Sequence, residues 1–234
     1  MKRILLLTSL LLAAAVASPQ GASARIVELG ADANPVVPSC PGDEDNPCVA
    51  VVRVTGLQGR TDGGRKHPFY IRRNGHITMF TVTLSQPTAE QVTFFNDNYG
   101  SPAQVQLSVL RKGTTRRTRL QYRLVQSSEE FAIDDYFGSS PTFVLDRPLR
   151  VKEGNWIAIT VPTWAPMLST DLTRTDWWRS SRPKNSCEPP RSLRQFAMQD
   201  LREVNTFGCT YSGARLTYTV TYVPDNKPTV DTEN

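Results

Sequence analysis

From residue 49 onward, polar and apolar residues alternate in short runs that are separated by turn-forming residues. In the segment 104–110, for example, Val105, Leu107 and Val109 alternate with polar neighbours. Alternation with a period of two is typical of β-strands that have one buried and one solvated face. The pattern predicts strands over residues 49–55, 77–84, 91–95, 104–110, 117–125, 143–151, 155–161 and 215–223.

Helical periodicity is nearly absent from the sequence. The one stretch that shows it is 192–203, where Leu193, Phe196, Ala197 and Leu201 recur at helical spacing. This stretch lies inside a long irregular segment, 162–208, and a loop of that length in a compact domain is usually functional or disordered. About eight short strands with turns between them predict an all-β fold, a single β-sandwich that includes the jelly roll among its candidate topologies. We expect one long disulfide-bearing loop and at most one short helix.

The N-terminus has the order of a secretory signal peptide. Lys2 and Arg3 precede an apolar run over residues 4–16, and two small-residue sites follow, one ending at Ala17 and the other at Ala24. The apolar run is shorter than the ~20 residues that a membrane-spanning helix needs. We predict cleavage after Ala24, because Pro19 and Gly21 end the apolar stretch just before it; cleavage after Ala17 is the alternative.

Four segments follow from these patterns. Residues 1–24 are predicted to be the signal peptide, 25–48 an N-terminal segment with a disulfide loop, 49–223 the β-sandwich, and 224–234 a loose polar tail. No later stretch is apolar and long enough to predict a transmembrane helix in the mature chain. We therefore expect a secreted, extracellular protein.

The chain contains four cysteines, and an even number in an exported protein predicts disulfides. Three pairings are possible. We favour Cys40–Cys48 with Cys187–Cys209, because each pair closes a local loop. A zinc site is disfavoured, since no C-x-x-C spacing and no nearby histidine accompany the cysteines.

The net charge of the chain says little about which class of partner it binds. The whole chain carries a formal charge of +5, and removing Lys2 and Arg3 reduces it to +3. A weak positive charge affects solubility and attraction to anionic surfaces, but it does not predict a nucleic-acid partner. No cofactor fingerprint is present, and we expect no cofactor and no metal.

The first candidate site is a row of arginines in the hairpin around Gly113. Alternation places Arg117, Arg119 and Arg123 on the outer face of the predicted strand 117–125, and Arg111 precedes the turn. Guanidinium groups bind carboxylates and phosphates in bidentate fashion, so the row could bind an anionic envelope polymer. The alternative, which we favour, is a solvated face whose charges acidic neighbours neutralise.

The second candidate site is aromatic. Trp164, Trp177 and Trp178 lie in or beside the long loop, and Tyr211 lies near its return. Exposed aromatic rings bind sugars and peptides at low entropic cost, so this set could contact a glycan. The alternative is that Trp177 and Trp178 form a small core under the loop, and we weight it more heavily.

Catalytic signatures are absent. The sequence contains no G-x-S-x-G, H-E-x-x-H, Walker A or dinucleotide fingerprint, and its two histidines, His67 and His76, lie at predicted turns. We therefore predict a non-catalytic binding or structural module at the cell envelope or outside it, with a glycan or anionic polymer as ligand. A secreted hydrolase that acts on envelope polysaccharide through unidentified carboxylates is the alternative.

Several strings resemble those of exported, uncharacterised bacterial proteins of an actinobacterial type. They are RVTGLQG (53–59), FFNDNYG (94–100), PLRVKEGNWIAITVPTWAP (148–166) and CTYSGARLTYTVTY (209–222). The resemblance covers most of the predicted mature chain. It implies secretion and β architecture, and it implies no activity.

Overall fold

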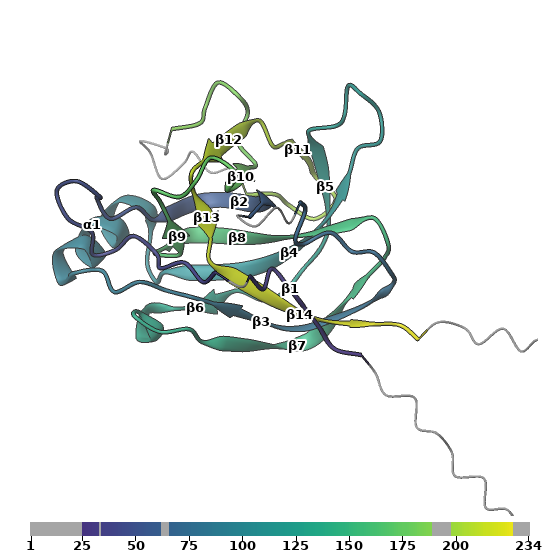
Figure 1. Ribbon diagram of the computed structural model, residues 1–234, viewed down its shortest axis with the longest axis horizontal. Coiled ribbons are helices and arrows are strands. Elements are labelled where there is room, and N and C mark those ends of the chain that lie inside the picture. Colours follow the sequence, from purple (N-terminus) through teal and green to yellow (C-terminus); the bar gives the residue numbers. More distant parts are fainter. Residues whose placement is uncertain (1–24, 33, 62–65, 189–197, 227–234) are drawn as a thin grey trace, which may run out of the picture.

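The computed structural model describes residues 25–32, 34–61, 66–188 and 198–226 (Figure 1). The predicted signal peptide and all but the first three residues of the predicted tail lie outside the described residues. Within the described part of the chain, no helix is long and apolar enough to cross a membrane.

Two antiparallel sheets form the body of the protein, and they are the lower and upper layers of Figure 1. The four-stranded sheet has the order β1 (Val27–Leu29), β14 (Tyr218–Pro224), β3 (Gly75–Val82) and β7 (Thr142–Val151). The path through the eight-stranded sheet is β11 (Val204–Thr206), β5 (Gln121–Ser127), β4 (Gln104–Lys112), β8 (Asn155–Ala165), β2 (Val51–Arg60), β10 (Trp177–Ser180) and β12 (Cys209–Ser212). Its eighth strand, β6 (Phe131–Ala132), pairs with β4.

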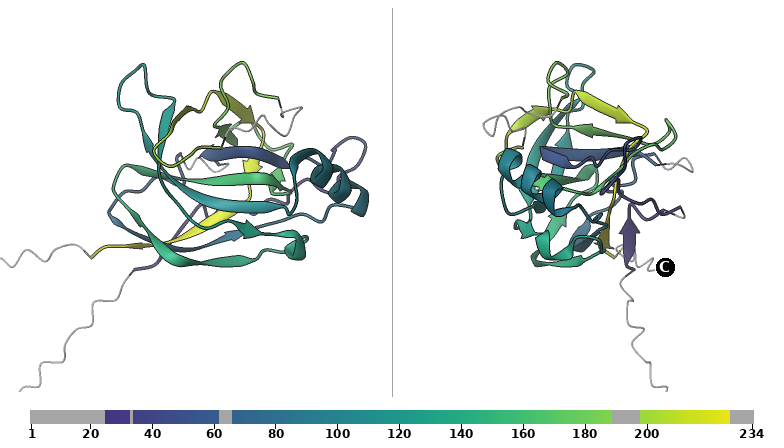
Figure 2. Two further views of the ribbon diagram at one scale, coloured as in Figure 1. Left: turned by 180° about the vertical axis from the view of Figure 1, so that it is seen from behind. Right: turned by 90° about the vertical axis from the view of Figure 1, so that its left-hand side faces the viewer.

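Three small elements complete the structure. Strands β9 (Leu168–Ser169) and β13 (Arg215–Leu216) pair with each other, and a 3₁₀ turn covers Asp134–Tyr136. The helix α1 (Ala89–Tyr99) lies at one end of the sandwich (Figures 1 and 2). The predicted all-β sandwich with one short helix is confirmed, although the helix is not where it was expected.

Strand β8 lies in the middle of the eight-stranded sheet and is buried on both faces. Ile157, Ile159 and Val161 belong to the main core between the two sheets, which also holds Ile77 and Phe80 of β3. Side chains at alternate positions of a strand point to opposite faces. The intervening residues of β8 therefore face away from the main core and need a separate cover.

That cover is a second apolar cluster on the outer face of the eight-stranded sheet. Its members come from β2, β4, β5, β8 and the segment after β11; they are Leu57, Leu110, Tyr122, Leu124, Trp156, Ala158 and Phe207. Phe207 is fully buried, and its backbone N–H donates to the carbonyl of Leu120. The long segment 162–208 is thus not a simple loop: it contributes β9, β10 and β11 and closes the outer face of the sheet.

The helix α1 corrects the strand predicted at 91–95. Thr88 and Gln91 form a capping box, in which each side chain bonds the backbone N–H of the other residue. The helix ends at Tyr99, and the capping residue Gly100 has a φ of 102°. The β-type residues Val92, Phe94 and Phe95 suggested a strand, but helix geometry lets Phe95 pack inward while Phe94 remains exposed.

Two further element predictions need correction. The strand expected at 117–125 begins only at Gln121, because residues 116–120 form a turn. Half of the helix expected at 192–203 lies outside the described residues, and its described half, 198–203, is not helical.

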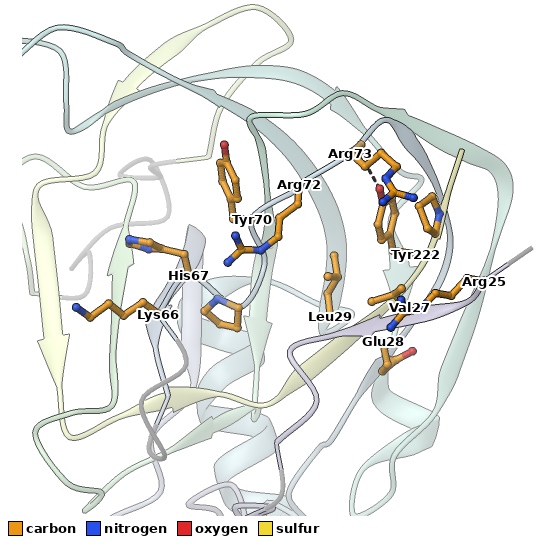
Figure 3. A pocket seen from close by; sticks show the side chains of 12 residues that line it. Arg25, Val27, Glu28, Leu29, Lys66, His67, Tyr70, Arg72, Arg73 and Tyr222 are labelled. Atoms are coloured by element: carbon orange, nitrogen blue, oxygen red, sulfur yellow. Dashed lines mark hydrogen bonds between the residues drawn. The ribbon is translucent and has the colours of Figure 1, made fainter. Parts of the chain in front are cut away.

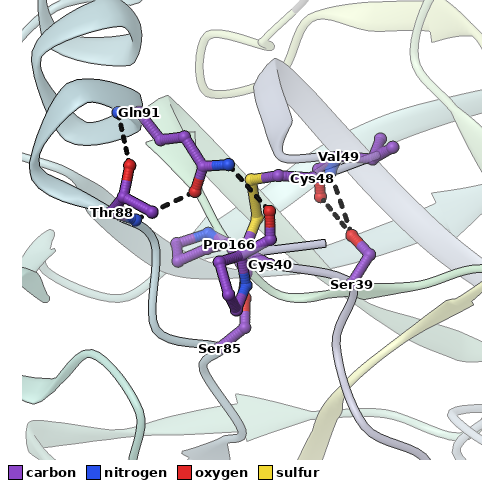
Figure 4. The surroundings of a disulfide bond; sticks show 9 residues. Ser39, Cys40, Cys48, Val49, Ser85, Thr88, Gln91 and Pro166 are labelled. Carbon is purple, nitrogen blue, oxygen red and sulfur yellow. Dashed lines mark hydrogen bonds between the residues drawn. A yellow bond between two sulfur atoms is a disulfide. The ribbon is translucent and has the colours of Figure 1, made fainter. Parts of the chain in front are cut away.

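Both favoured disulfides, Cys40–Cys48 and Cys187–Cys209, are present. The first closes a short loop beside α1, where the Gln91 side-chain amide donates to the carbonyl of Pro41 at 2.7 Å (Figure 4). Ser39 and Val49 flank the bridge and exchange two hydrogen bonds through the Ser39 hydroxyl. The disulfide therefore closes a loop within the N-terminal segment, and polar contacts hold this loop against α1 and the start of the sandwich.

One of the two edge strands of the four-stranded sheet, β7, is irregular. Its register with β3 shifts between Ile77 and Met79, so the residues from Leu145 to Pro148 bulge away from the ladder. Asp146, Arg147 and Pro148 are exposed within this bulge.

A buried ion pair joins three distant segments. The Arg215 guanidinium contacts Asp176 Oδ1 at 2.6 Å and Asp32 Oδ2 at 3.3 Å, and it also donates to the carbonyl of Asn34. The side chains of Arg215 and Asp176 are only 7% and 1% exposed. Buried charges are tolerated when they are paired and hydrogen-bonded, as they are here.

We predict that Arg215→Gln lowers the free energy of unfolding by about 3–5 kcal/mol, because the buried Asp176 carboxylate would lose the positive charge that it faces. Guanidinium denaturation measures the change. Arg150→Gln is the control: it removes an ion pair to Asp225 with side chains 54% and 36% exposed, and it should cost less than about 1 kcal/mol. Equal losses in the two variants would contradict the prediction.

Candidate functional site: a basic groove beside Trp156

The predicted aromatic set does not form an exposed surface. Trp164 is fully buried, packs against Phe95 and Phe137 with ring centroids 4.8 and 5.4 Å away, and donates its indole N–H to Asn96. It belongs to the main core, because a large apolar ring is needed where α1 meets β8. The expectation that Trp164 contacts a ligand is therefore corrected.

Trp178 is also a core residue. It is 4% exposed and stacks on Tyr211 at a centroid distance of 4.4 Å. The Tyr211 hydroxyl donates to the carbonyl of Cys187. Trp178 is therefore buried beside the Cys187–Cys209 bridge, as the alternative expected, but it belongs to the main core and not to a separate small one. Trp177 points to the opposite face, where it lies over Gly59 and stays partly exposed.

The predicted arginine row is only partly brought together. Arg111 and Arg123 lie directly opposite each other on β4 and β5, and both are exposed. Arg117 and Arg119 lie in the turn between these strands and not on a common sheet face. Arg123 donates to the carbonyl of Arg202, so its guanidinium already has a backbone partner.

A different basic surface is built by the segment that follows β2. Phe69 and Ile71 are buried, and their backbone groups pair with the first residues of β8 through three hydrogen bonds of 2.9–3.0 Å. This short extended stretch acts as an extra edge beside β8. Because side chains alternate along it, Tyr70 and Arg72 point outward while Phe69 stacks on Tyr218 in the core.

The outward side chains line a groove of about 360 Å³ between this segment and the edge formed by β1 and β14 (Figure 3). Five basic residues contribute to it: Arg25, Lys66, His67, Arg72 and Arg73. The single acidic lining residue is Glu28, whose carboxylate accepts a hydrogen bond from the Thr221 hydroxyl. Among the described residues, no ion pair neutralises any of the five.

Aromatic rings surround the groove. Tyr70 and Tyr222 line it, and the Tyr222 hydroxyl donates to the carbonyl of Arg73 at 2.6 Å. The Arg72 guanidinium lies 6.0 Å from the centre of the Tyr70 ring. Tyr70 and His67 both meet Trp156 edge-on, with ring centroids 5.2 and 4.7 Å away. Trp156 thus supports the groove wall from the second apolar cluster.

His67 is surrounded by positive charge. Burial lowers its pKa from 6.5, and so do the charges of nearby basic side chains, in decreasing order Lys112, Lys66, Arg179 and Arg72. The nearby Tyr122 adds no negative charge, because burial raises its pKa to about 12. The protonated form of His67 therefore lacks a described anionic partner.

A second, larger cavity of about 470 Å³ has the opposite character. Glu130, Asp200 and Glu203 share it with side-chain amides that include Gln106 and Gln199. Glu203 accepts a hydrogen bond from the Asp200 backbone, and Glu130 accepts a long one from Gln104. Within the described ranges, no group of three His, Cys, Asp or Glu side chains is arranged to hold a metal ion.

Sequence reasoning treated His67 as a turn residue and missed the groove. One signal was available: residues 66–73 read KHPFYIRR, in which basic residues flank an alternating aromatic stretch. Such a run is typical of an extended edge that buries every second side chain.

No family model matches the sequence, and no curated protein or solved structure matches it either. The assignment of function therefore depends on the chemistry of the surfaces described above.

We predict that Trp164→Ala and Trp178→Ala each lower the free energy of unfolding by about 3–5 kcal/mol, because each leaves a large cavity in the core. Trp177→Ala should cost clearly less, since its ring is partly exposed. Urea denaturation of the three variants gives the comparison. If Trp164→Ala were as stable as the unchanged protein, its placement in the core would be wrong.

Proposed function

We propose that this protein is a secreted, non-catalytic module that binds an anionic polysaccharide through the groove formed by residues 66–73 and the edge of β1 and β14. The observation that carries the proposal is the charge of the groove: five basic residues face one carboxylate that is already hydrogen-bonded.

The groove chemistry favours a negatively charged ligand. Arg72 and Arg73 can each form bidentate hydrogen bonds to a sulfate, phosphate or carboxylate group. Their charges lie in the same groove as that of Lys66, and like charges near one another raise the free energy of the unliganded protein. A bound anion would reduce this repulsion. Its binding free energy therefore includes the relief of repulsion in addition to the direct contacts that it makes.

The rings favour a sugar backbone between the charged groups. Tyr70 and Tyr222 provide partly apolar walls in the same groove, and aromatic faces pack well against the apolar faces of sugar rings. The groove is partly open to solvent, which suits a chain that continues beyond it. A polymer is therefore preferred to a small enclosed metabolite.

An exported location supports the same proposal. The two disulfides are compatible with an oxidising compartment, and the first 24 residues have the pattern of a signal peptide. Polysaccharides that carry charge are common ligands outside the cytosol.

The hydrolase alternative has one observation in its favour, because three carboxylates share the second cavity. Glu130, Asp200 and Glu203 are all exposed, and two of them accept hydrogen bonds from protein groups. A general acid needs a site that stabilises its protonated form, and exposure to water does not provide one. We therefore prefer binding to catalysis.

The proposal is tested with dextran sulfate, an anionic polysaccharide, and with unsulfated dextran as the neutral counterpart. The unchanged protein should bind dextran sulfate and not dextran at about 0.15 M salt, measured by isothermal titration calorimetry. Arg72→Gln combined with Arg73→Gln should weaken binding at least tenfold, because two charge-assisted contacts of about 1.5–3 kcal/mol are lost.

Arg147→Gln combined with Arg174→Gln is the matched control. Both residues are exposed, lie outside the groove and change the net charge by the same amount. Equal weakening in the two double variants would show that net charge alone attracts the polymer, and the groove would lose its assignment.

Binding should strengthen as the pH falls. The pKa of His67 is below 6.5 in the free protein, and a bound anion raises it. At a pH between the pKa of the free protein and that of the complex, His67 therefore takes up a proton when the anion binds. The affinity for dextran sulfate, which stays ionised, should rise between about pH 8 and pH 5. His67→Gln should flatten this dependence while leaving the affinity at the alkaline end nearly unchanged; an unaltered slope would contradict the role given to His67.

A further inference from the structure

A second group of cations lies beyond the groove, on the outer face of the eight-stranded sheet. Its members are Lys112 at the end of β4, Arg179 on β10 and Arg119 in the turn before β5. None of the three lines the groove. Neither the predicted arginine row nor the predicted aromatic set included Lys112 or Arg179.

The strand register places Lys112 and Arg179 on a common face. Lys112 is directly opposite Tyr122, and Arg179 is directly opposite Leu57. Residues opposite each other in an antiparallel ladder project to the same side of the sheet. Because Tyr122 and Leu57 both belong to the second apolar cluster, Lys112 and Arg179 project to the side that carries this cluster.

Aromatic rings position the two cationic groups. The Lys112 ammonium lies 5.3 Å from the centre of the Trp156 ring, and the Arg179 guanidinium lies 5.1 Å from the centre of the Trp177 ring. Arg179 also donates its Nε–H to the Thr210 hydroxyl at 3.1 Å, and no acceptor among the described residues contacts its terminal amino groups. Cation–π contacts orient these side chains without neutralising their charge.

His67 connects this group to the groove. It lines the groove, its ring contacts Trp156 at 4.7 Å, and Lys112 contacts the same indole. The pKa of Lys112 is lowered, mainly by burial and also by the positive charges of Arg179 and Arg119. Lys112 is therefore close enough to interact with both of these residues. Among the described residues, no carboxylate forms an ion pair with any of the three cations.

We propose that Lys112 and Arg179, which lie over the rings of Trp156 and Trp177, form a second anion subsite. One polysaccharide chain with repeated negative charges then passes over His67 and occupies the groove and this subsite together. This inference rests on the function proposed above and defines the ligand further: a polymer whose charges recur along its length. A ligand with a single charged group would fill only one of the two places.

Joining two subsites on one chain raises the affinity, because the second contact becomes intramolecular once the first has formed. Each cation that contacts a polyanion also releases counterions, so the number of contacts appears in the salt dependence of binding. These two properties distinguish a second subsite from a general positive field.

The test is Lys112→Gln combined with Arg179→Gln, with dextran sulfate as the probe and salt varied. We expect the affinity to fall about tenfold and the slope of log K against log salt to become shallower by about one to two units. The melting temperature of the variant should be unchanged or higher, because like-charge repulsion is removed. If Arg179→Gln disturbs β10, Lys112→Gln alone is the informative variant. It should lose less affinity, and its slope should change by about one unit.

The controls separate the two proposals. If the Lys112/Arg179 variant behaves like the Arg147/Arg174 variant while the Arg72/Arg73 variant still weakens binding, the second subsite is overturned and the groove stands. If the unchanged protein does not bind dextran sulfate at all, both proposals fail. A fourfold variant combines the substitutions of Arg72, Arg73, Lys112 and Arg179 by Gln. If it loses more affinity for dextran sulfate than either double variant, one chain spans both places.

Discussion

Strand β8 has to be shielded from water on both of its faces, and the rest of the structure is arranged around this requirement. On one side Ile157 and Ile159 meet the four-stranded sheet, and on the other Trp156 and Ala158 meet the cluster closed by Phe207. At its first residues, β8 also pairs with the stretch that contains Phe69 and Ile71. The groove exists because this pairing turns the intervening side chains outward beside Trp156.

The molecule accommodates charged side chains in two different ways. Arg215 is buried, and Asp176, Asp32 and a backbone carbonyl satisfy it, so its charge stabilises the fold only as part of a set. The cations around His67 stay near solvent and have no described acidic partner. Water screens them at modest cost, and the charge that they retain can be used for binding. Burial and function therefore place different demands on otherwise similar arginines.

Much of the fold could be predicted from the sequence, because alternation over segments such as 104–110 and 215–223 reports which side of a strand is buried. The helix α1 could not be predicted from hydrophobic pattern alone, since Val92, Phe94 and Phe95 suit either state; its capping pair, Thr88 and Gln91, was the better signal. Strands as short as β9 and β10 leave no periodicity to detect. The proposed second subsite needs Lys112 and Arg179 to be brought together beside Trp156 and Trp177, and only tertiary pairing does that.

The irregular edge at β7 has a consequence for how the molecules would gather on a long ligand. An open strand edge offers unpaired backbone groups to a neighbour, and copies crowded along one polymer would meet such edges often. Pro148 lacks an N–H to donate, and Asp146 and Arg147 add charge where the strand bulges. On the proposed polymer, neighbouring copies would therefore be kept from pairing edge to edge through β7.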